Sequence, residues 1–348
     1  MVEATIDVAG LVGHRYRADD YYEVGREKIR EYARAVQDFH PVHWNEDAAD
    51  ELGYAGLVAP TTFISIAAML ANRKLFETVI TGYDVFVQTD QVFEMYKPVL
   101  SGDRLVSDVE LAAVRRIAGK DLLTIKNTFT DQTGQVVQIM HTTVVGVTGE
   151  DVDAGISDAM ERVIMHGIDV PSRTAAASRA GADEQVVTDP VSDTGPRHSP
   201  IARTRIPRTV IRFEDITVGD ELAPRIAQLT RGDLVNYAGV AGDANPIHWH
   251  DGVAALAGLP DVIAHGMLTM GLGAGYVTGW LGDPGALTRY GVRLSNYTVV
   301  EAASVGSVEF TGRIKSVDPE TRTAVVVIVA KSAGRKIFGL ATADVRLA

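Results

Sequence analysis

The chain matches itself at an offset of 205 residues, and this internal repeat limits its possible folds more than any other feature. The segment Tyr32–Phe63 aligns without gaps on Tyr237–Leu268. Trp and His are rare residues, and their coincidence in one register argues against chance. A period this long indicates two copies of one domain, because solenoid repeats are shorter and more numerous. The identical pairs include Tyr32/Tyr237, Asp38/Asp243, Pro41/Pro246, His43/His248, Trp44/Trp249, Gly53/Gly258 and Ala59/Ala264.

The length of the chain agrees with two copies. Its 348 residues suit two domains of roughly 150 residues each. We expect one domain over residues 1–150 and the other over residues 206–348. The segment 151–205 between them is rich in Ser, Ala, Gly, Asp and Pro, which predicts a linker. Within it, only Ala159–Met165 is predicted to form a short helix.

Both copies share one predicted order of elements. A helix precedes the shared loop, a small helix follows it, and a longer apolar helix comes next. Three or four strands rich in Val and Ile finish each copy. One apolar helix followed by antiparallel strands predicts an α+β fold, with the helix packed on one face of a sheet. The predicted helices are Gly25–Val36, Asp47–Leu52, Thr61–Phe76, Thr230–Ala241, Asp251–Ala257 and Gly266–Leu281; the predicted strands are Phe86–Phe93, Asp103–Ile117, Asp121–Asp131, Val136–Val147, Thr209–Phe213, Gly291–Val299, Ser304–Ser316, Thr323–Ala330 and Lys336–Arg346.

The composition excludes several kinds of site and partner. Without cysteine the chain has no disulfide, no thiolate metal site and no Cys nucleophile. A net charge of -12 argues against general nucleic-acid binding. The first residues lack the pattern of a secretory signal, and no segment approaches the roughly 18 uncharged apolar residues of a membrane span. We therefore expect a cytoplasmic protein that contacts neither nucleic acid nor membrane.

The second copy combines residues suited to moving protons beside a carbonyl group. Asp243 and His248 lie five positions apart on a loop, where a carboxylate and an imidazole can share one cleft and tune each other's pKa. The amide of Asn245 can hold one of them in place. Gly266 opens the predicted apolar helix, where unpaired N–H groups and the helix dipole can stabilise an oxyanion. Acid, base and oxyanion donor are what dehydration beside a thioester carbonyl requires.

Other interpretations of these residues are also possible. A loop Asp or His is more often a helix cap or a surface residue. His248 and His250 form an H-x-H pair, but no further spacing typical of metal ligands accompanies it. The sequence GLGAGYVTG lies inside the predicted helix and does not follow a strand, so it indicates tight packing of a sheet on the helix rather than nucleotide binding. We predict no metal and no cofactor.

The motif Y-x-x-x-x-G-D-x-N-P-I-H with H-G-M downstream resembles the hydratase motif of MaoC-like hot-dog proteins, the (R)-specific enoyl-thioester hydratases. Residues 213–348, with LTRGDLVNYAGVAGDANPIHW and IAHGMLTMG, are similar to the B subunit of actinobacterial (3R)-hydroxyacyl-ACP dehydratases of the HadAB type. Residues 10–151, with YYEVGREKIREYARAVQ and KPVLSGD, are similar to the A or C partner subunit. The chain thus resembles two fused subunits.

This resemblance implies a double hot-dog fold, in which two antiparallel sheets each wrap a central helix and join into one continuous sheet. It implies dehydration of (3R)-3-hydroxyacyl thioesters in fatty-acid elongation, with long chains destined for mycolic acids. The family's catalytic pair carries onto Asp243 and His248, and its positioning residues carry onto Asn245 and Gly266. The implied substrate is an acyl thioester of acyl carrier protein or CoA, with a transient contact to the carrier protein. One chain would form a pseudo-dimer, and homo-oligomers remain open.

The first copy departs from the family pattern. Partner subunits usually lack the catalytic pair, whereas Asp38 and His43 stand here in register. His40 replaces the Asn position, and Thr61 replaces the Gly position. We expect a degenerate second site, in a half that instead shapes the acyl pocket.

Two rival functions remain: an (R)-specific enoyl-CoA hydratase in fatty-acid degradation, and a non-catalytic acyl-binding protein. The arginines Arg197, Arg203, Arg205 and Arg208 at the end of the linker could contact an acidic carrier protein, although a solvated linker explains them as well.

Overall fold

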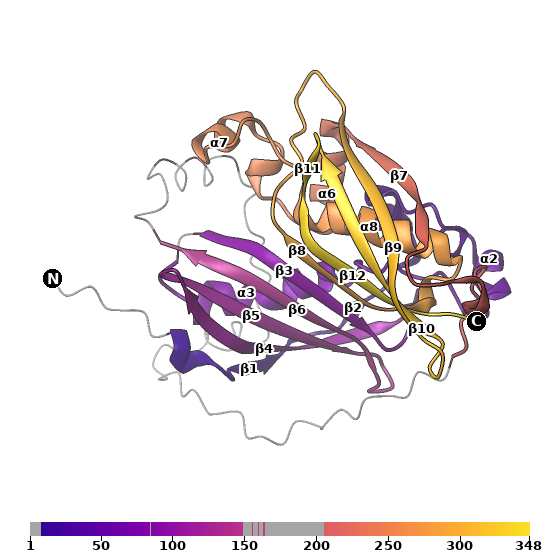
Figure 1. The fold of residues 1–348 in the computed structure, drawn as a ribbon. Helices are drawn as coiled ribbons and strands as arrows, with labels where there is room; N and C mark the ends of the chain where they lie inside the picture. Colours follow the sequence, from indigo (N-terminus) through magenta and orange to yellow (C-terminus); the bar gives the residue numbers. More distant parts are fainter. Residues whose placement is uncertain (1–7, 84, 149–154, 156–158, 160–162, 164–204) are drawn as a thin grey trace.

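The computed structural model describes residues 8–83, 85–148, 155, 159, 163 and 205–348 (Figure 1). Most of the predicted linker, with most of the helix expected at Ala159–Met165, lies outside the described residues. The strands of the first half are β1 (Arg15–Arg17), β2 (Tyr22–Glu23), β3 (Val85–Met95), β4 (Arg104–Ile117), β5 (Lys120–Thr130) and β6 (Val136–Val147). Those of the second half are β7 (Glu221–Leu229), β8 (Leu287–Leu294), β9 (Gly306–Asp318), β10 (Thr323–Ser332), β11 (Arg335–Lys336) and β12 (Phe338–Arg346).

All these strands belong to one antiparallel sheet that runs through both halves. Its order is β1-β4-β5-β6-β3-β8-β12-β10-β9-β7, with β2 on β4 and β11 on β10. The halves join where β3 pairs with β8, from Asp90 opposite Arg293 to Glu94 opposite Arg289. The Arg293 guanidinium also lies 2.9 Å from the Asp90 carboxylate across this junction. The predicted double hot-dog architecture with one continuous sheet is therefore confirmed.

The helices lie against this sheet as the apolar patterns predicted. They are α1 (Arg26–Ala35), α2 (Glu46–Glu51), α3 (Ser65–Lys74), α6 (Arg231–Ala241), α7 (Asp251–Leu256) and α8 (Gly266–Leu281). Figure 1 shows α3 with the strands of the first half and α8 with those of the second. Helix α8 is buried along most of its length, and one hydrophobic core extends across both halves. Among the described residues, no helix combines the length and the apolar run that crossing a bilayer needs.

Three of the predicted elements differ clearly in the structure, and strand β7 is not among the predicted strands. The strand expected at Gly291–Val299 is β8, which begins at Leu287 and ends at Leu294. Helix α3 begins at Ser65 rather than Thr61, because residues 61–64 form tight turns in which Phe63 N–H donates to Pro60 O and Ser65 N–H donates to Thr62 O. The strand expected at Thr209–Phe213 does not form. Its backbone instead closes the end of α8, where Val210 N–H donates to Leu281 O at 2.9 Å.

Candidate active site

The loop between α6 and α7 carries the predicted pair of the second half. Helix α6 ends at Gly242, whose positive φ of 76° turns the chain sharply before Asp243. The Asn245 side-chain oxygen then accepts a hydrogen bond from Ile247 N–H at 3.2 Å and caps the short 3-10 helix Pro246–His248. Asn245 therefore fixes the turn on which His248 stands.

A tryptophan closes this loop in each half. Trp249 Nε1–H donates to the carbonyl of Ala244, and Trp44 Nε1–H donates to that of Asp38, both at 3.1 Å. The repeated Trp is thus explained by the geometry of the loop, which both halves have kept.

His248 is held as a neutral imidazole with one free nitrogen. Its Nδ1 lies 2.7 Å from the carbonyl oxygen of Ile263, and because a carbonyl only accepts, Nδ1 carries the proton. Nε2 is then left with a lone pair. Burial lowers the pKa of His248, while the charge of Asp243 and the bond to Ile263 oppose that shift. A neutral ring with a free Nε2 is suited to act as a base.

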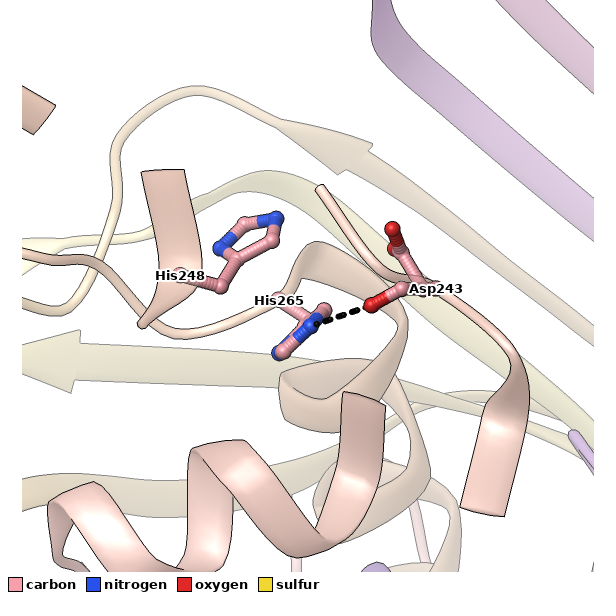
Figure 2. Close-up of side chains that lie close together, drawn as sticks. All are labelled: Asp243, His248 and His265. Atoms are coloured by element: carbon pink, nitrogen blue, oxygen red, sulfur yellow. Dashed lines mark hydrogen bonds between the residues drawn. The ribbon is translucent and has the colours of Figure 1, made fainter. Parts of the chain in front are cut away.

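Asp243 is less buried than His248 and is not ion-paired with it. Asp243 is half-buried, whereas His248 is only 7% exposed. Both belong to a group with His265 whose possible ligand atoms all lie within 4.8 Å of one another. Figure 2 shows the three side chains close together, and His265 is the N-cap residue of α8. The carboxylate and the imidazole are therefore close enough to act on one small substrate group.

His265 is the functional candidate that the sequence reasoning missed. Its ring is fully buried and stacks on that of His248, with 3.8 Å between centroids and 28° between planes. Its Nε2 lies 3.3 Å from the main-chain carbonyl of Asp243, the contact drawn in Figure 2. The residue stands in the quoted motif H-G-M, but only the fold brings it beside His248.

Two histidines and one carboxylate also form a donor set that zinc accepts. The geometry fits this poorly, because the two rings stack almost parallel and His265 Nε2 already faces the carbonyl of Asp243. We keep the prediction of a site that works without metal. Dialysis against a chelator should leave activity unchanged, and a loss restored by zinc would contradict this.

In the first half, the corresponding pair is Asp38 and His43. We call this pair closed, because the two side chains are buried and in contact with each other. His43 Nε2 lies 3.3 Å from Asp38 Oδ2, and the two side chains are 1% and 6% exposed. Burial acts to raise the pKa of Asp38, but neighbouring His43 and His40 outweigh it and hold that pKa below its usual value. Helix α8 covers the pair, because a Cβ built on Gly275 would lie 3.2 Å from the Asp38 carboxyl carbon. Asp38 and His43 thus form a buried contact that leaves no space for a substrate between them.

The oxyanion position also differs between the halves. Gly266 is the first residue of α8, as predicted, so N–H groups of the first turn and the positive end of the dipole are available there. A Cβ at Gly266 would come within 2.7 Å of Leu294 Cδ1. Thr61 lies instead in the turns before α3, and its carbonyl accepts a hydrogen bond from Gln138 Nε2 at 3.2 Å. Only the second half places a glycine at the start of its central helix.

Two cavities have linings that include neither Asp243 nor His248. One of about 390 Å³ lies near Thr61 and Pro60 and is bordered by both halves. Another of about 300 Å³ lies in the first half beside α3. Neither is lined by a pair of titratable groups like Asp243 and His248, so the chemistry of the side chains, rather than the size of a cavity, identifies the candidate active site.

The burial of His265 predicts a stability that falls in acid. Burial, with a further contribution from His248, lowers the pKa of His265 from 6.5 to about 2. His265 therefore takes up a proton at higher pH in the unfolded state than in the folded state. Its contribution to the free energy of unfolding is fully present above pH 6.5 and is lost as the pH falls toward 2. Between pH 6.5 and 4.5 the loss amounts to about 2 kcal/mol.

Urea unfolding at both pH values should show this difference in the wild type and a smaller one in His265→Phe, which cannot titrate. An equal dependence on pH in the two proteins would show that His265 takes up protons normally in the folded state.

Comparisons with known proteins agree with the fold of the two halves. A model of the FAS1-like dehydratase domain region matches residues 10–140, and a model of the MaoC-like domain matches residues 213–332. A UPF0336 protein of Mycolicibacterium paratuberculosis is 44% identical over 151 residues, which cover 43% of this chain and 95% of that protein. A conserved hypothetical protein of Mycobacterium tuberculosis with a double hotdog fold is 13% identical, with a TM-score of 0.60 over 97% of this chain and 96% of that one, and shows the fold alone.

A further similarity covers both halves at once. A solved MaoC-like dehydratase is 52% identical to the chain, with a TM-score of 0.89 over 98% of this chain and 100% of that one. The chain therefore belongs to the MaoC-like dehydratase family, and it is a hydro-lyase built as two fused hot-dog halves.

Proposed function

We propose that the chain interconverts (3R)-3-hydroxyacyl thioesters and trans-2-enoyl thioesters, with Asp243 and His248 of the second half as its acid/base pair. The observation that carries the proposal is the state of His248. Its Nδ1 is bonded to Ile263 O, its ring lies in one group with the half-buried Asp243 carboxylate, and it stacks on His265, the residue before the glycine that begins α8. The motif resemblance supplies the thioester substrate, the (3R) configuration and a role in fatty-acid elongation.

The reaction needs two proton transfers and one charged intermediate or transition state. A base removes the proton from C2, the electron pair forms the double bond to C3, and the C3–O bond breaks. The leaving hydroxyl takes a proton and departs as water. Asp243 and His248 share these two transfers, and N–H groups at the start of α8, beside Gly266, stabilise the negative charge on the thioester oxygen.

Hydration of enoyl thioesters tests the proposal directly. The purified chain should hydrate enoyl thioesters of graded length, carried on CoA and on acyl carrier protein, to the (3R) product. Preference for the carrier-protein substrate supports biosynthesis, whereas equal or better use of CoA favours the degradative hydratase. No turnover on either carrier would leave the non-catalytic acyl-binding protein as the better description.

The arginines proposed for carrier contact have other partners in the structure. Arg205 lies 2.9 Å from the buried carboxylate of Asp283, and Arg208 N–H donates to the same carboxylate at 2.6 Å. The Arg208 guanidinium donates to Glu51 O, so this segment attaches the second half to the first. Arg197 and Arg203 lie outside the described residues. Reversing the charge of Arg205 or Arg208 would disturb this attachment, so we place carrier recognition elsewhere.

We further propose that the first half houses the acyl chain. The cavity beside α3 is lined in part by the apolar residues Ala67, Leu70 and Phe129, and also by the charged residues Arg17, Asp19, Asp20 and Lys74. In the repeat, Leu70 corresponds to Gly275, the residue that approaches Asp38. From this correspondence we propose that Leu70 of α3 faces the loop of Asp243 as Gly275 of α8 faces Asp38, and a leucine cannot approach a loop as closely as a glycine does. Leu70 is 58% exposed, as a residue bordering an open channel would be.

Leu70→Trp should therefore shorten the acyl chains that are accepted. Each methylene denied burial costs about 0.8 kcal/mol, so the loss of room for two lowers kcat/KM for long substrates by roughly tenfold. Short substrates should be unaffected. The control is Ile117→Trp, at a residue that is 56% exposed and lines neither cavity. Ile64 and Ala68 of the same segment are fully buried, and Trp there would disrupt the core. The same chain-length profile in Leu70→Trp and wild type would place the acyl chain elsewhere.

A further inference from the structure

His265 occupies a position that ordinary structural roles do not explain. It is the N-cap residue of α8, yet its side chain makes no capping hydrogen bond. It is fully buried, and its Nδ1 has no hydrogen-bond partner. An unsatisfied buried nitrogen costs free energy that an apolar side chain of similar size would avoid. A histidine kept there at a cost to stability points to a role in the neighbouring site.

The contacts of His265 reach three parts of that site. Its Nε2 lies 3.3 Å from Asp243 O, and because this carbonyl only accepts, Nε2 carries the proton of the neutral ring. The face of the ring lies against His248 at 3.8 Å, and Tyr237 packs against it at 4.8 Å. The next residue is Gly266, the first of α8. One side chain thus contacts the main chain of Asp243 and the ring of His248, beside the oxyanion position.

The first half provides an internal comparison. Pro60 stands there at the position of His265 and can neither stack on an imidazole nor donate a hydrogen bond from its side chain. The ring of His40 lies edge-on to that of His43, with 5.9 Å between centroids and 63° between planes. The closed pair therefore lacks the stacked partner that the open pair has.

We propose that His265 is a positioning residue, which holds the His248 ring and the Asp243 main chain in register with the oxyanion position at Gly266. This inference rests on the proposed function, since it assigns the geometry of the same acid/base pair. The stacked face restricts rotation of the His248 ring, so that its Nδ1 stays on Ile263 O and its Nε2 faces the substrate. The bond from Nε2–H fixes the loop that carries the carboxylate.

Two substitutions separate the two contacts. His265→Phe keeps an aromatic face and removes the donor, whereas His265→Gln keeps a donor and removes the stacked ring. Because small misplacements of catalytic groups are costly, each should lower kcat by about tenfold to a hundredfold, while KM changes by less than about twofold. The control is His250→Asn. His250 Nδ1 accepts from Val253 N–H at 3.2 Å to cap α7, and Asn can replace that cap, so kcat should stay at the wild-type value.

A measurement without substrate separates this inference from the proposed function. Nitrogen-15 spectra of the imidazoles should show His248 as a single Nδ1–H tautomer in wild type and as a mixture of tautomers in His265→Gln. If wild type hydrates no enoyl thioester, the proposed function fails while the spectra still decide the positioning role. An unchanged His248 tautomer in both folded variants, or a kcat within about twofold of wild type in both, overturns the inference. Thermal unfolding identifies a variant that fails to fold, and the other variant then decides.

Discussion

Asp243→Asn and His248→Ala are each expected to lower turnover by about a hundredfold to ten-thousandfold while the fold survives. Asp243→Asn keeps the shape of the side chain and removes its charge and its capacity to move a proton. His248→Ala removes the ring whose Nδ1 is bonded to Ile263 O and which lies in one group with that carboxylate. Stopped-flow hydration of one enoyl thioester, with circular dichroism to confirm folding, measures both effects.

Isothermal titration with a non-hydrating saturated acyl thioester serves as the control, because both variants should still bind it. If either folded variant kept turnover near that of wild type, the site would have been assigned to the wrong residues. A parallel loss of binding and turnover would instead indicate a damaged pocket.

A second large difference is expected between equivalent histidines of the two halves. His43→Ala should leave the chemical step nearly intact, whereas His248→Ala removes it. The physical reason is access: the Asp38–His43 pair is closed at 3.3 Å under α8, and Thr61 precedes α3 instead of beginning it. Losing an oxyanion donor costs about 3–4 kcal/mol, which would make a second site negligible beside the first.

His43→Ala should nevertheless lower stability by about 1–3 kcal/mol, because it removes a buried side chain bonded to Val58 O and leaves that carbonyl and the buried Asp38 carboxylate without their neighbour. Its single-turnover rate must therefore be measured below its unfolding temperature and normalised to folded protein. The asymmetric model fails if His43→Ala and His248→Ala each remove about half of the activity, because that result requires two working sites.

The sequence pattern predicted the bounds of those helices and strands that are set by neighbouring residues in the chain. Helix α8 has the predicted bounds, because an unbroken apolar run ends at Gly282, which takes the left-handed conformation. Strand β6 also has its predicted bounds, Val136–Val147, and its burial alternates over residues 143–147. Helix α3 was extended too far toward its N-terminus, because its apolar pattern continues through Thr61 and Thr62 while the backbone there forms isolated turns.

The parts that the sequence could not supply depend on contacts between distant residues. His265 lies seventeen positions from His248, and no pattern indicates that their rings stack. The closure of the Asp38–His43 pair depends on Gly275 of the other half, whose missing side chain lets α8 approach Asp38. The repeat shows that both halves carry an Asp and a His at equivalent positions. Only the folded structure shows that a substrate can reach one pair and not the other.

The junction of β3 with β8 has a consequence for how the enzyme behaves at low concentration. The two halves share strand hydrogen bonds and a common core. Either half alone would therefore expose an unpaired strand edge and apolar residues that the other half covers. Two separate subunits with this interface would dissociate on dilution by mass action. Covalent linkage fixes each half at a high effective concentration for its neighbour, in the millimolar range for a short flexible tether and lower for a longer one. The stacked histidines and the proposed acyl channel therefore remain assembled in one molecule however scarce the protein is, which independently expressed halves could not achieve.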